Sequence, residues 1–226
     1  MSLHMHREIE KLKKKILALS AYVEESVSRA VKALEDRDAK LAARVIESDD
    51  EIDRMEVDLE EDCLKILALH QPVANDLRFI IAVLKINNDL ERIGDLATNV
   101  AERATTLAGV ERGDIPIDLR AMAENVQWML NTSLYSLVTE NDRLAYQVCT
   151  SDDIVDKIHR DSFARIEEAM KRNPEKIGVY LQVLSVSRQL ERIADHTTNI
   201  AEDVIYMLEG QIVRHRSGKL LGQSGR

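Results

Sequence analysis

Apolar residues recur along most of this chain at the three- and four-residue spacing of amphipathic helices. The pattern predicts six long helices, over about residues 5–35, 39–70, 73–107, 117–140, 142–172 and 175–209. The three prolines, Pro72, Pro116 and Pro174, each fall between two of these helices. Because most of the connections are short, consecutive helices are expected to run antiparallel. The sequence therefore predicts an all-α fold.

The polar positions reveal an internal duplication. Residues 90–102 and 190–202 are identical at nine of thirteen positions, and residues 48–53 resemble residues 151–156. We therefore expect two tandem, sequence-related three-helix bundles, at residues 1–107 and 117–209, with a linker at 108–116 and a flexible basic tail at 210–226. A duplicated core needs only its apolar positions, whereas this duplication also preserves carboxylate, Asn and Thr residues.

Composition narrows the class of protein. Aromatic residues make up 4% of the chain, and it has only 8 Gly and 3 Pro. So few turn-forming residues argue against a β-sandwich, a barrel or a βαβ sheet. Charged residues are 31% of the total and the longest apolar run has six members, so no membrane-spanning helix is expected. The net charge of −9 disfavours a nucleic-acid partner.

The two cysteines, Cys63 and Cys149, lack the spacing of a zinc site or a disulfide framework. We expect buried structural thiols in a reduced, cytoplasmic protein without a signal peptide. The aromatic residues Trp128, Tyr135 and Phe163 are expected to pack in the core or between the two repeats.

The spacing of the acidic residues is the feature of the sequence that indicates a binding site. Four pairs of like charges occur one helical turn apart, at Asp49/Asp53, Glu91/Asp95, Asp152/Asp156 and Glu191/Asp195. Such a pair destabilises an exposed helix by about 0.2–0.5 kcal/mol. In each repeat, the two pairs lie at similar distances before and after the predicted hairpin turn, near Gln71 or Asn173. Each hairpin is therefore expected to assemble four carboxylates at one level.

Four converging carboxylates repel one another, and a multivalent cation would relieve that repulsion. Oxygen ligands without a thiolate suit Fe, Mn, Mg or Ca, with Zn as a further choice. His159, three residues after Asp156, is a candidate nitrogen ligand, although a histidine on a polar helix face is often simply solvated. The alternatives are an acidic patch that receives a basic partner, or a purely structural bundle with solvated acids.

Catalytic motifs are missing from the sequence. It has no Gly-rich phosphate loop, no GxSxG motif and no credible Ser/His/Asp set, so an enzyme is not expected. A metal-dependent phosphohydrolase or oxidase that uses the carboxylate clusters is the alternative. A run of lysines makes the first predicted helix locally basic, which suits an anionic membrane, an acidic partner or plain solvent exposure: Lys11, Lys13, Lys14 and Lys15.

Taken together, these motifs resemble the PhoU family. The resemblance rests on His70–Phe79, on Asn88–Asp95 and on the second copy that ends at Glu191–His196, and it covers about residues 7–209. It implies two similar three-helix bundles. In some family members the Glu/Asp-x-x-x-Asp motifs carry multinuclear iron or zinc clusters, and the matching residues here are Asp49, Asp53, Glu91, Asp95, Asp152, Asp156, Glu191 and Asp195.

The same resemblance implies a cytoplasmic negative regulator of the phosphate-starvation response. Such a regulator works with the ATPase subunit of the phosphate ABC transporter and with the sensor histidine kinase, and it reaches the membrane only through these partners. The oligomeric state stays open between a monomer and a homodimer. The second copy has Arg188-Gln189 where the first has Asn88-Asp89, so the two sites need not hold equal numbers of metal ions.

Overall fold

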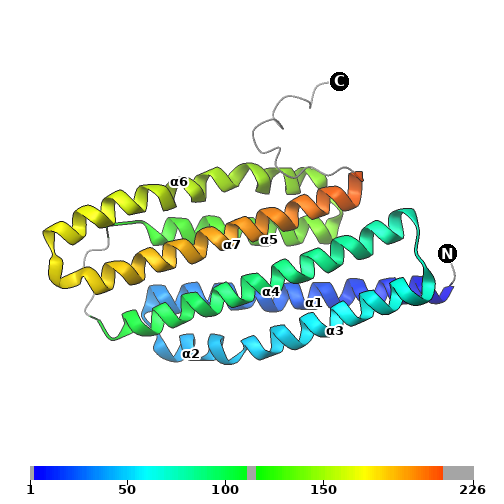
Figure 1. The fold of residues 1–226 in the computed structure, drawn as a ribbon, viewed down its shortest axis with the longest axis horizontal. Helices are drawn as coiled ribbons and strands as arrows, with labels where there is room; N and C mark the ends of the chain where they lie inside the picture. Colours follow the sequence, from blue (N-terminus) through cyan, green and yellow to red (C-terminus); the bar gives the residue numbers. More distant parts are fainter. Residues whose placement is uncertain (1–2, 111–115, 211–226) are drawn as a thin grey trace, which may run out of the picture.

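The computed structural model describes residues 3–110 and 116–210, and this part of the chain is helical, without a strand (Figure 1). The predicted all-α fold is confirmed. The predicted helix boundaries agree within a few residues except at one break. The elements are α1 (Leu3–Asp36), α2 (Ala39–Glu47), α3 (Asp49–His70), α4 (Ala74–Ala108), α5 (Leu119–Thr139), α6 (Asp142–Arg172), the 3-10 helix η1 (Pro174–Lys176) and α7 (Ile177–Glu209).

The break lies at Ser48, so the prediction of one continuous helix over residues 39–70 is wrong. The Ser48 hydroxyl donates to the carbonyl oxygen of Val45 at 2.8 Å, and its backbone N–H bonds to the same oxygen at 3.1 Å. Such local bonding by serine competes with the regular helical ladder. Asp49 and its two acidic neighbours then occupy the first turn of α3, where the helix dipole favours negative charge.

Side-chain caps begin several of the helices. The Asp38 carboxylate accepts from the backbone N–H groups of Lys40 and Leu41 at the start of α2, at 2.9 and 3.0 Å. Asp118 caps α5 and Asn141 caps α6 in the same way. The first bundle consists of α1, α4 and the α2–α3 pair, and the second consists of α5, α6 and α7.

The two bundles pack side by side, mainly through α4 and α7, with α1 against α5 (Figure 1). Their cores are aliphatic, and Ile86, Ile93 and Val100 of α4 are at most 1% exposed, as the sequence predicts. An ion pair crosses the seam between α4 and α7, where Nζ of Lys85 lies 3.0 Å from Oδ1 of the buried Asp203.

The aromatic residues lie elsewhere than predicted. Trp128, Tyr135 and Phe163 are 45%, 60% and 51% exposed, so none of them is buried in the core as expected, although Tyr135 lines a groove between α1 and α5, where the two bundles meet. On α5 the inward positions are filled by Met122 and Met129 instead, which are fully buried. Flexible methionines and aliphatic residues fill the narrow space between helices, and the bulky rings stay outside.

The thiols of Cys63 and Cys149 are free, with Cys63 buried and Cys149 half-buried. Burial raises the pKa of each thiol to about 12, so both are inert. None of the described helices combines the length and apolar character needed to cross a bilayer. Residues 111–115 of the predicted linker, and the predicted tail beyond Gly210, lie outside the described residues. The division into units at 1–107 and 117–209 stays a prediction.

Candidate metal centre

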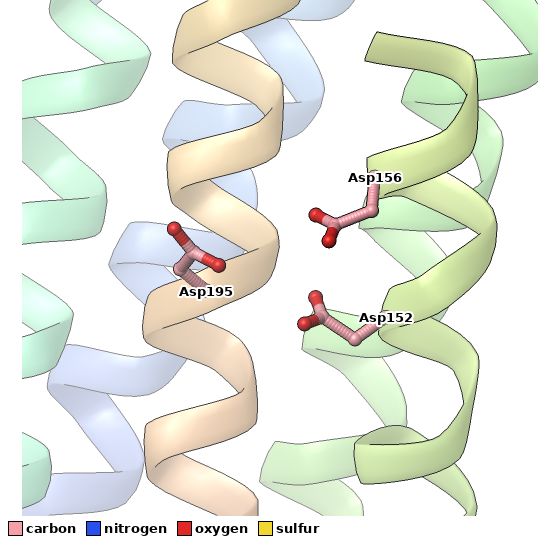
Figure 2. Close-up of side chains that lie close together, drawn as sticks. All are labelled: Asp152, Asp156 and Asp195. Carbon is pink, nitrogen blue, oxygen red and sulfur yellow. The ribbon is translucent and has the colours of Figure 1, made fainter. Parts of the chain in front are cut away.

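Three aspartates of the second repeat converge between α6 and α7. Asp152 and Asp156 lie one turn apart on α6 and point toward Asp195 on α7 (Figure 2). One carboxylate oxygen from each residue lies within 4.8 Å of the other two. Oxygen ligands of Mg²⁺ or Ca²⁺ lie about 2.1–2.5 Å from the metal, and hence about 3–4 Å from their neighbours. Small side-chain rotations would therefore let the three aspartates share one cation.

The surroundings of these three aspartates disfavour their ionised, negatively charged form. Burial, followed by the charges of Asp195 and Asp156, raises the pKa of Asp152 to about 7. Burial, followed by the charges of Glu191 and Asp156, raises the pKa of Asp195 to about 6. Oδ1 of Asp152 is shielded from solvent and has no hydrogen-bond partner in the described part of the chain. Asp152 and Asp195 therefore hold protons to a higher pH than an ordinary aspartate, and a divalent cation would displace those protons.

The first repeat brings its four acids to one level in a looser arrangement. Burial, with contributions from the charges of Asp53 and Asp95, raises the pKa of Asp49. Burial, with the charges of Asp95 and Asp53, also raises the pKa of Glu91. Among the described residues, no three of these acids meet the 4.8 Å spacing of the second repeat. The first cluster is thus the weaker candidate for a metal site.

Arg92 supplies the first cluster with a positive charge of its own. Its guanidinium lies 3.4 Å from a carboxylate oxygen of Glu91 and 3.5 Å from one of Asp95. Sequence reasoning gave this arginine no role, because its position between the two acids of a helical motif does not fix the direction of its side chain. A cation that binds at the first cluster would have to compete with this guanidinium.

Glu191, the fourth predicted acid of the second repeat, lies outside the group of three aspartates. Burial raises its pKa first, and the charge of Asp156 raises it further, whereas Arg188 and Arg192 lower it. The positive charge of Arg188, expected beside the second site, is thus felt at Glu191. Glu191 lies within electrostatic reach of the group without belonging to it.

A glycine controls how closely α3 approaches α4 in the first repeat. A Cβ atom on Gly94 would lie only 3.1 Å from Cδ1 of Ile52 and 3.6 Å from Oδ1 of Asp49. Ile52 is itself 1% exposed, so there is little room for it to move. The small residue on α4 therefore holds the backbone that carries Asp49 and Asp53 against the backbone that carries Glu91 and Asp95.

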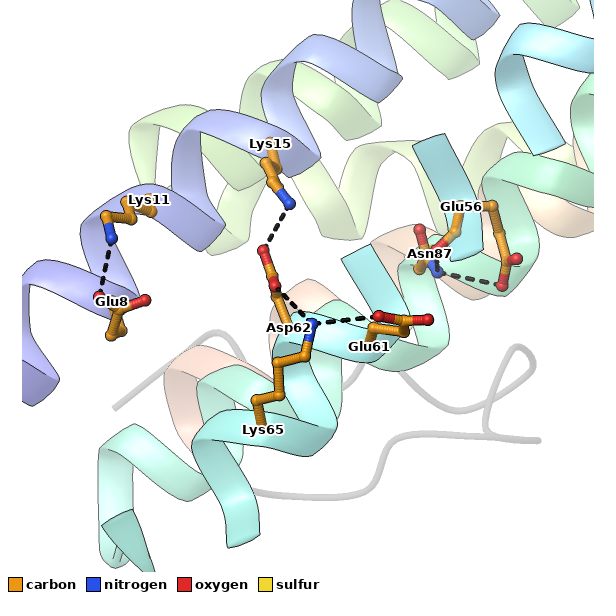
Figure 3. Close-up of polar contacts among 8 residues, drawn as sticks. All are labelled: Glu8, Lys11, Lys15, Glu56, Glu61, Asp62, Lys65 and Asn87. Atoms are coloured by element: carbon orange, nitrogen blue, oxygen red, sulfur yellow. Dashed lines mark hydrogen bonds and ion pairs between the residues drawn. The ribbon is translucent and has the colours of Figure 1, made fainter. Parts of the chain in front are cut away.

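His159 connects α6 to α7 through a contact that we did not predict from the sequence. Its Nδ1 lies 2.9 Å from Oγ of Ser187, and its ring packs edge-on against Phe163 at 5.1 Å between centroids. At the corresponding place in the first repeat, Asn87 donates to the carbonyl and the carboxylate of Glu56, at 3.0 and 3.1 Å (Figure 3). Each contact ties the two helices of a hairpin together near the acids. Aligning the repeats would have revealed this pairing.

A further bridge connects the two repeats beside both acid clusters. Nδ1 of His196 lies 2.8 Å from Oδ1 of Asp89, and Asn199 donates to the same oxygen at 3.2 Å. Asp89 stands two residues before Glu91, and His196 directly follows Asp195. Sequence reasoning missed this bridge because neither Asp89 nor His196 has an identical counterpart in the other repeat.

The donor set consists of carboxylate oxygens, and no described thiol belongs to it. These oxygens fit hard or borderline cations such as Mg, Ca, Mn, Fe or Zn. Two tandem helical bundles, with acids that face one another across each hairpin, define a duplicated all-α protein with a candidate cation-binding centre in its second repeat.

Comparison with known sequences identifies the family. The sequence profile of the PhoU domain matches residues 16–104 and again residues 119–204. These two matches correspond to the two halves of the duplication. The chain therefore belongs to the PhoU family.

Relatives share both the length and the fold. The chain is 40% identical over 217 residues to a phosphate-specific transport system accessory protein PhoU homolog of Pseudomonas aeruginosa, covering 95% of this chain and 89% of that one. Its identity to the homolog of Aquifex aeolicus is 37% over 219 residues, covering 97% and 99%. The crystal structure of PhoU from Pseudomonas aeruginosa superposes with a TM-score of 0.87 at 39% identity, covering 91% of this chain and 99% of that one.

Proposed function

We propose that this protein is a regulatory adaptor of phosphate transport. Its family membership supports this role, as does a similarity over nearly its whole length to proteins named accessory proteins of the phosphate-specific transport system. In this proposal, it acts in the cytoplasm, where it represses the phosphate-starvation response and modulates phosphate uptake. Its partners are the ATPase subunit of the phosphate ABC transporter and the sensor histidine kinase, as the resemblance to the family implies.

The second part of the proposal is that a cation at the second repeat organises the surface that partners contact. The observation that carries this part is the convergence of Asp152, Asp156 and Asp195 within 4.8 Å. A bound Mg, Ca, Mn, Fe or Zn ion would neutralise the aspartates and fix α6 relative to α7. The first cluster, consisting of Asp49, Asp53, Glu91 and Asp95, would bind a cation more weakly because Arg92 already offsets part of its charge.

A binding experiment tests the adaptor role. Immobilised protein is presented with the purified transporter ATPase subunit and, separately, with the cytoplasmic part of the sensor kinase, with and without a chelator. We expect both partners to be retained, and retention to fall when the chelator removes the cation. The double variant Asp152→Asn/Asp195→Asn should behave like chelated protein, whereas Asp153→Asn, a neighbouring exposed acid, should behave like the wild type.

If neither the chelator nor the double variant changes the retention of the partners, the adaptor role stands and the role of the cation is refuted. Failure to retain either partner would remove the adaptor role itself. We further propose that the chain catalyses no reaction of its own, which its resemblance to accessory proteins supports. A phosphatase assay with added Mn or Fe tests this point, and turnover that Asp152→Asn abolishes would contradict it.

A further inference from the structure

Two threonines hold equivalent places in the two repeats. Thr98 follows Asp95 by three residues on α4, and Thr198 follows Asp195 by three residues on α7. Residues three apart are neighbours on the surface of a helix, so each threonine lies on the same face as the aspartate before it. The duplication thus places one hydroxyl group beside each acid cluster.

Neither of these hydroxyl groups bonds to its own helix. A threonine inside a helix often donates to the carbonyl one turn earlier, and Thr197, the direct neighbour of Thr198, donates to Ile193 in this way at 2.8 Å. Oγ1 of Thr98 and Oγ1 of Thr198, in contrast, are shielded from solvent and form no hydrogen bond in the described part of the chain. A shielded polar atom without a partner is costly, so it calls for an explanation. The usual bond to the helix is also formed by Thr105, Thr106 and Thr139.

Each of the two hydroxyl groups lies beside an aspartate of the facing helix. The Thr198 hydroxyl is close enough to Asp152 to lower the pKa of that carboxyl, against the larger, opposite effect of burial. The Thr98 hydroxyl acts in the same way on the pKa of Asp49. Oδ1 of Asp152 is likewise shielded from solvent and has no hydrogen-bond partner in the described structure. An O–H donor and a carboxylate that can accept from it therefore lie near each other between α6 and α7.

A neutral donor suits a carboxylate that has to bind a cation. An ionised carboxylate offers about four lone-pair positions, so Asp152 can accept one O–H group and still bind a metal ion. The hydroxyl stabilises the ionised form and adds no positive charge to the site. In the first cluster, the guanidinium of Arg92 also stabilises ionised Glu91 and Asp95, but its positive charge competes with a cation.

We propose that Thr198 is a positioning residue of the cation centre in the second repeat. Its hydroxyl donates to the carboxylate of Asp152, keeps this ligand ionised and fixes the direction of the lone pairs that remain for the metal. Thr98 stands in the same relation to Asp49 in the weaker first cluster. The inference rests on the proposed cation centre, and it adds to that centre a residue outside the Glu/Asp-x-x-x-Asp motifs.

The packing of Thr198 can be separated from its hydroxyl by one substitution. Valine has nearly the same shape as threonine and a similar helix propensity, so it fills the same space with a methyl group in place of Oγ1. Removing a shielded hydroxyl that lacks a partner should leave the metal-free protein at least as stable as the wild type. Thr198→Val should therefore weaken cation binding without weakening the fold.

Titration calorimetry of the full-length protein with Mn²⁺ tests the proposal. Thr198→Val should weaken binding at the tighter site about tenfold or more, which is the loss expected when a metal ligand loses its hydrogen-bond partner. Thr198→Ser keeps the hydroxyl and should bind nearly as tightly as the wild type. The matched control Thr197→Val removes the neighbouring hydroxyl, which already donates to its own helix, and should bind like the wild type. Urea unfolding with chelator should show no loss of stability in Thr198→Val.

The positioning role would be refuted by a Thr198→Val variant that binds Mn²⁺ as tightly as the wild type, or by a Thr198→Ser variant that loses as much affinity as Thr198→Val. A metal-free Thr198→Val protein that unfolds at a lower urea concentration than the wild type would show a structural role instead. Each of these results leaves the cation centre itself standing. A wild-type protein that binds no Mn²⁺ would refute the centre, and the role of Thr198 with it.

Discussion

One arginine distinguishes the two acid clusters at the scale of single residues. Arg92 pairs with Glu91 and Asp95 in the first repeat. Its counterpart Arg192 lowers the pKa of Glu191 and of Asp195, yet it forms no ion pair with either residue in the described structure. The second cluster therefore keeps more uncompensated negative charge, and it is also the cluster whose carboxylates lie closest together.

The raised pKa of Asp152 predicts how stability depends on pH. The pKa is about 7 in the folded protein against an ordinary value of 3.8, so the folded state binds more protons than the unfolded chain between these values. Metal-free protein should therefore lose stability as pH rises through this window. Asp152→Asn should remove about 1 kcal/mol of that loss after allowance for solvent screening. Urea unfolding at pH 5 and pH 8 with chelator measures the effect, and an identical pH dependence in the variant would contradict the assignment.

The contact between His159 and Ser187 predicts a structural role for the histidine. His159→Ala should lower the free energy of unfolding by about 1 kcal/mol, because it removes one hydrogen bond and the edge-on contact with Phe163. Cation affinity should stay within about twofold of the wild type, since the loss of a side chain that binds the cation directly would cost far more. Calorimetric titration with Mn²⁺ separates the outcomes. A loss of cation affinity of about tenfold or more would show that His159 binds the cation directly.

Sequence reasoning could predict the acids but not their neighbours. The repeated spacing and level of Asp152, Asp156 and Asp195 follow from helix geometry, which is regular over long distances. The directions of long side chains such as Arg92, and the partner of His159, depend on packing between helices and have no periodic pattern. The role of His159 was nevertheless accessible, because Glu56 and Asn87 occupy the corresponding positions of the first repeat.

At the scale of elements, the spacing between the two helices of each hairpin depends on a pair of facing residues. Both members of this pair differ between the two repeats. Gly94 faces Ile52 in the first repeat, and the corresponding residues of the second repeat are Ala194 and Val155. The larger residue on one helix goes with the smaller residue on the other. This exchange keeps the total volume between the helices nearly constant, which cores tolerate best.

This pairing makes a prediction about coupling. Gly94→Ala gains about 1 kcal/mol of helix propensity but crowds Ile52, at a cost of about 1–3 kcal/mol, so the single variant should be destabilised. Adding Ile52→Val should relieve the crowding, with a favourable coupling energy of about 1 kcal/mol. Urea unfolding of the two single variants and the double variant measures this energy. Simple additivity would show that α3 and α4 can separate freely here.

Periodicity predicted where most helices begin and end, because an amphipathic face must stay in register with the core. It failed at Ser48, because the buried positions Val45, Ile52 and Leu59 keep the seven-residue spacing of a continuous helix through the break. It also misplaced Trp128 and Tyr135, because large hydrophobic residues were assumed to be buried. The cores between these helices are narrow, and smaller aliphatic side chains fill them.

At the scale of the whole molecule, acidic residues gather along α3, where residues 49–62 contain nine acids and one arginine. The seam between the bundles holds specific polar contacts, such as Lys85 with Asp203. The corresponding residues of the other repeat are Ser185 and Arg103, so the duplication offered no hint of this pair. How the bundles join was therefore beyond sequence reasoning.

The most direct test of the account is the cation content of the purified protein. After equilibrium dialysis against Mn²⁺ or Fe²⁺, elemental analysis should find at least one tightly held ion in the wild type and in Asp153→Asn. The variant Asp152→Asn/Asp195→Asn should lose that ion while its helical circular dichroism stays unchanged. A folded double variant that retains the full complement of metal, or a wild type that holds none under these conditions, would contradict the claim that the three aspartates form a cation-binding centre.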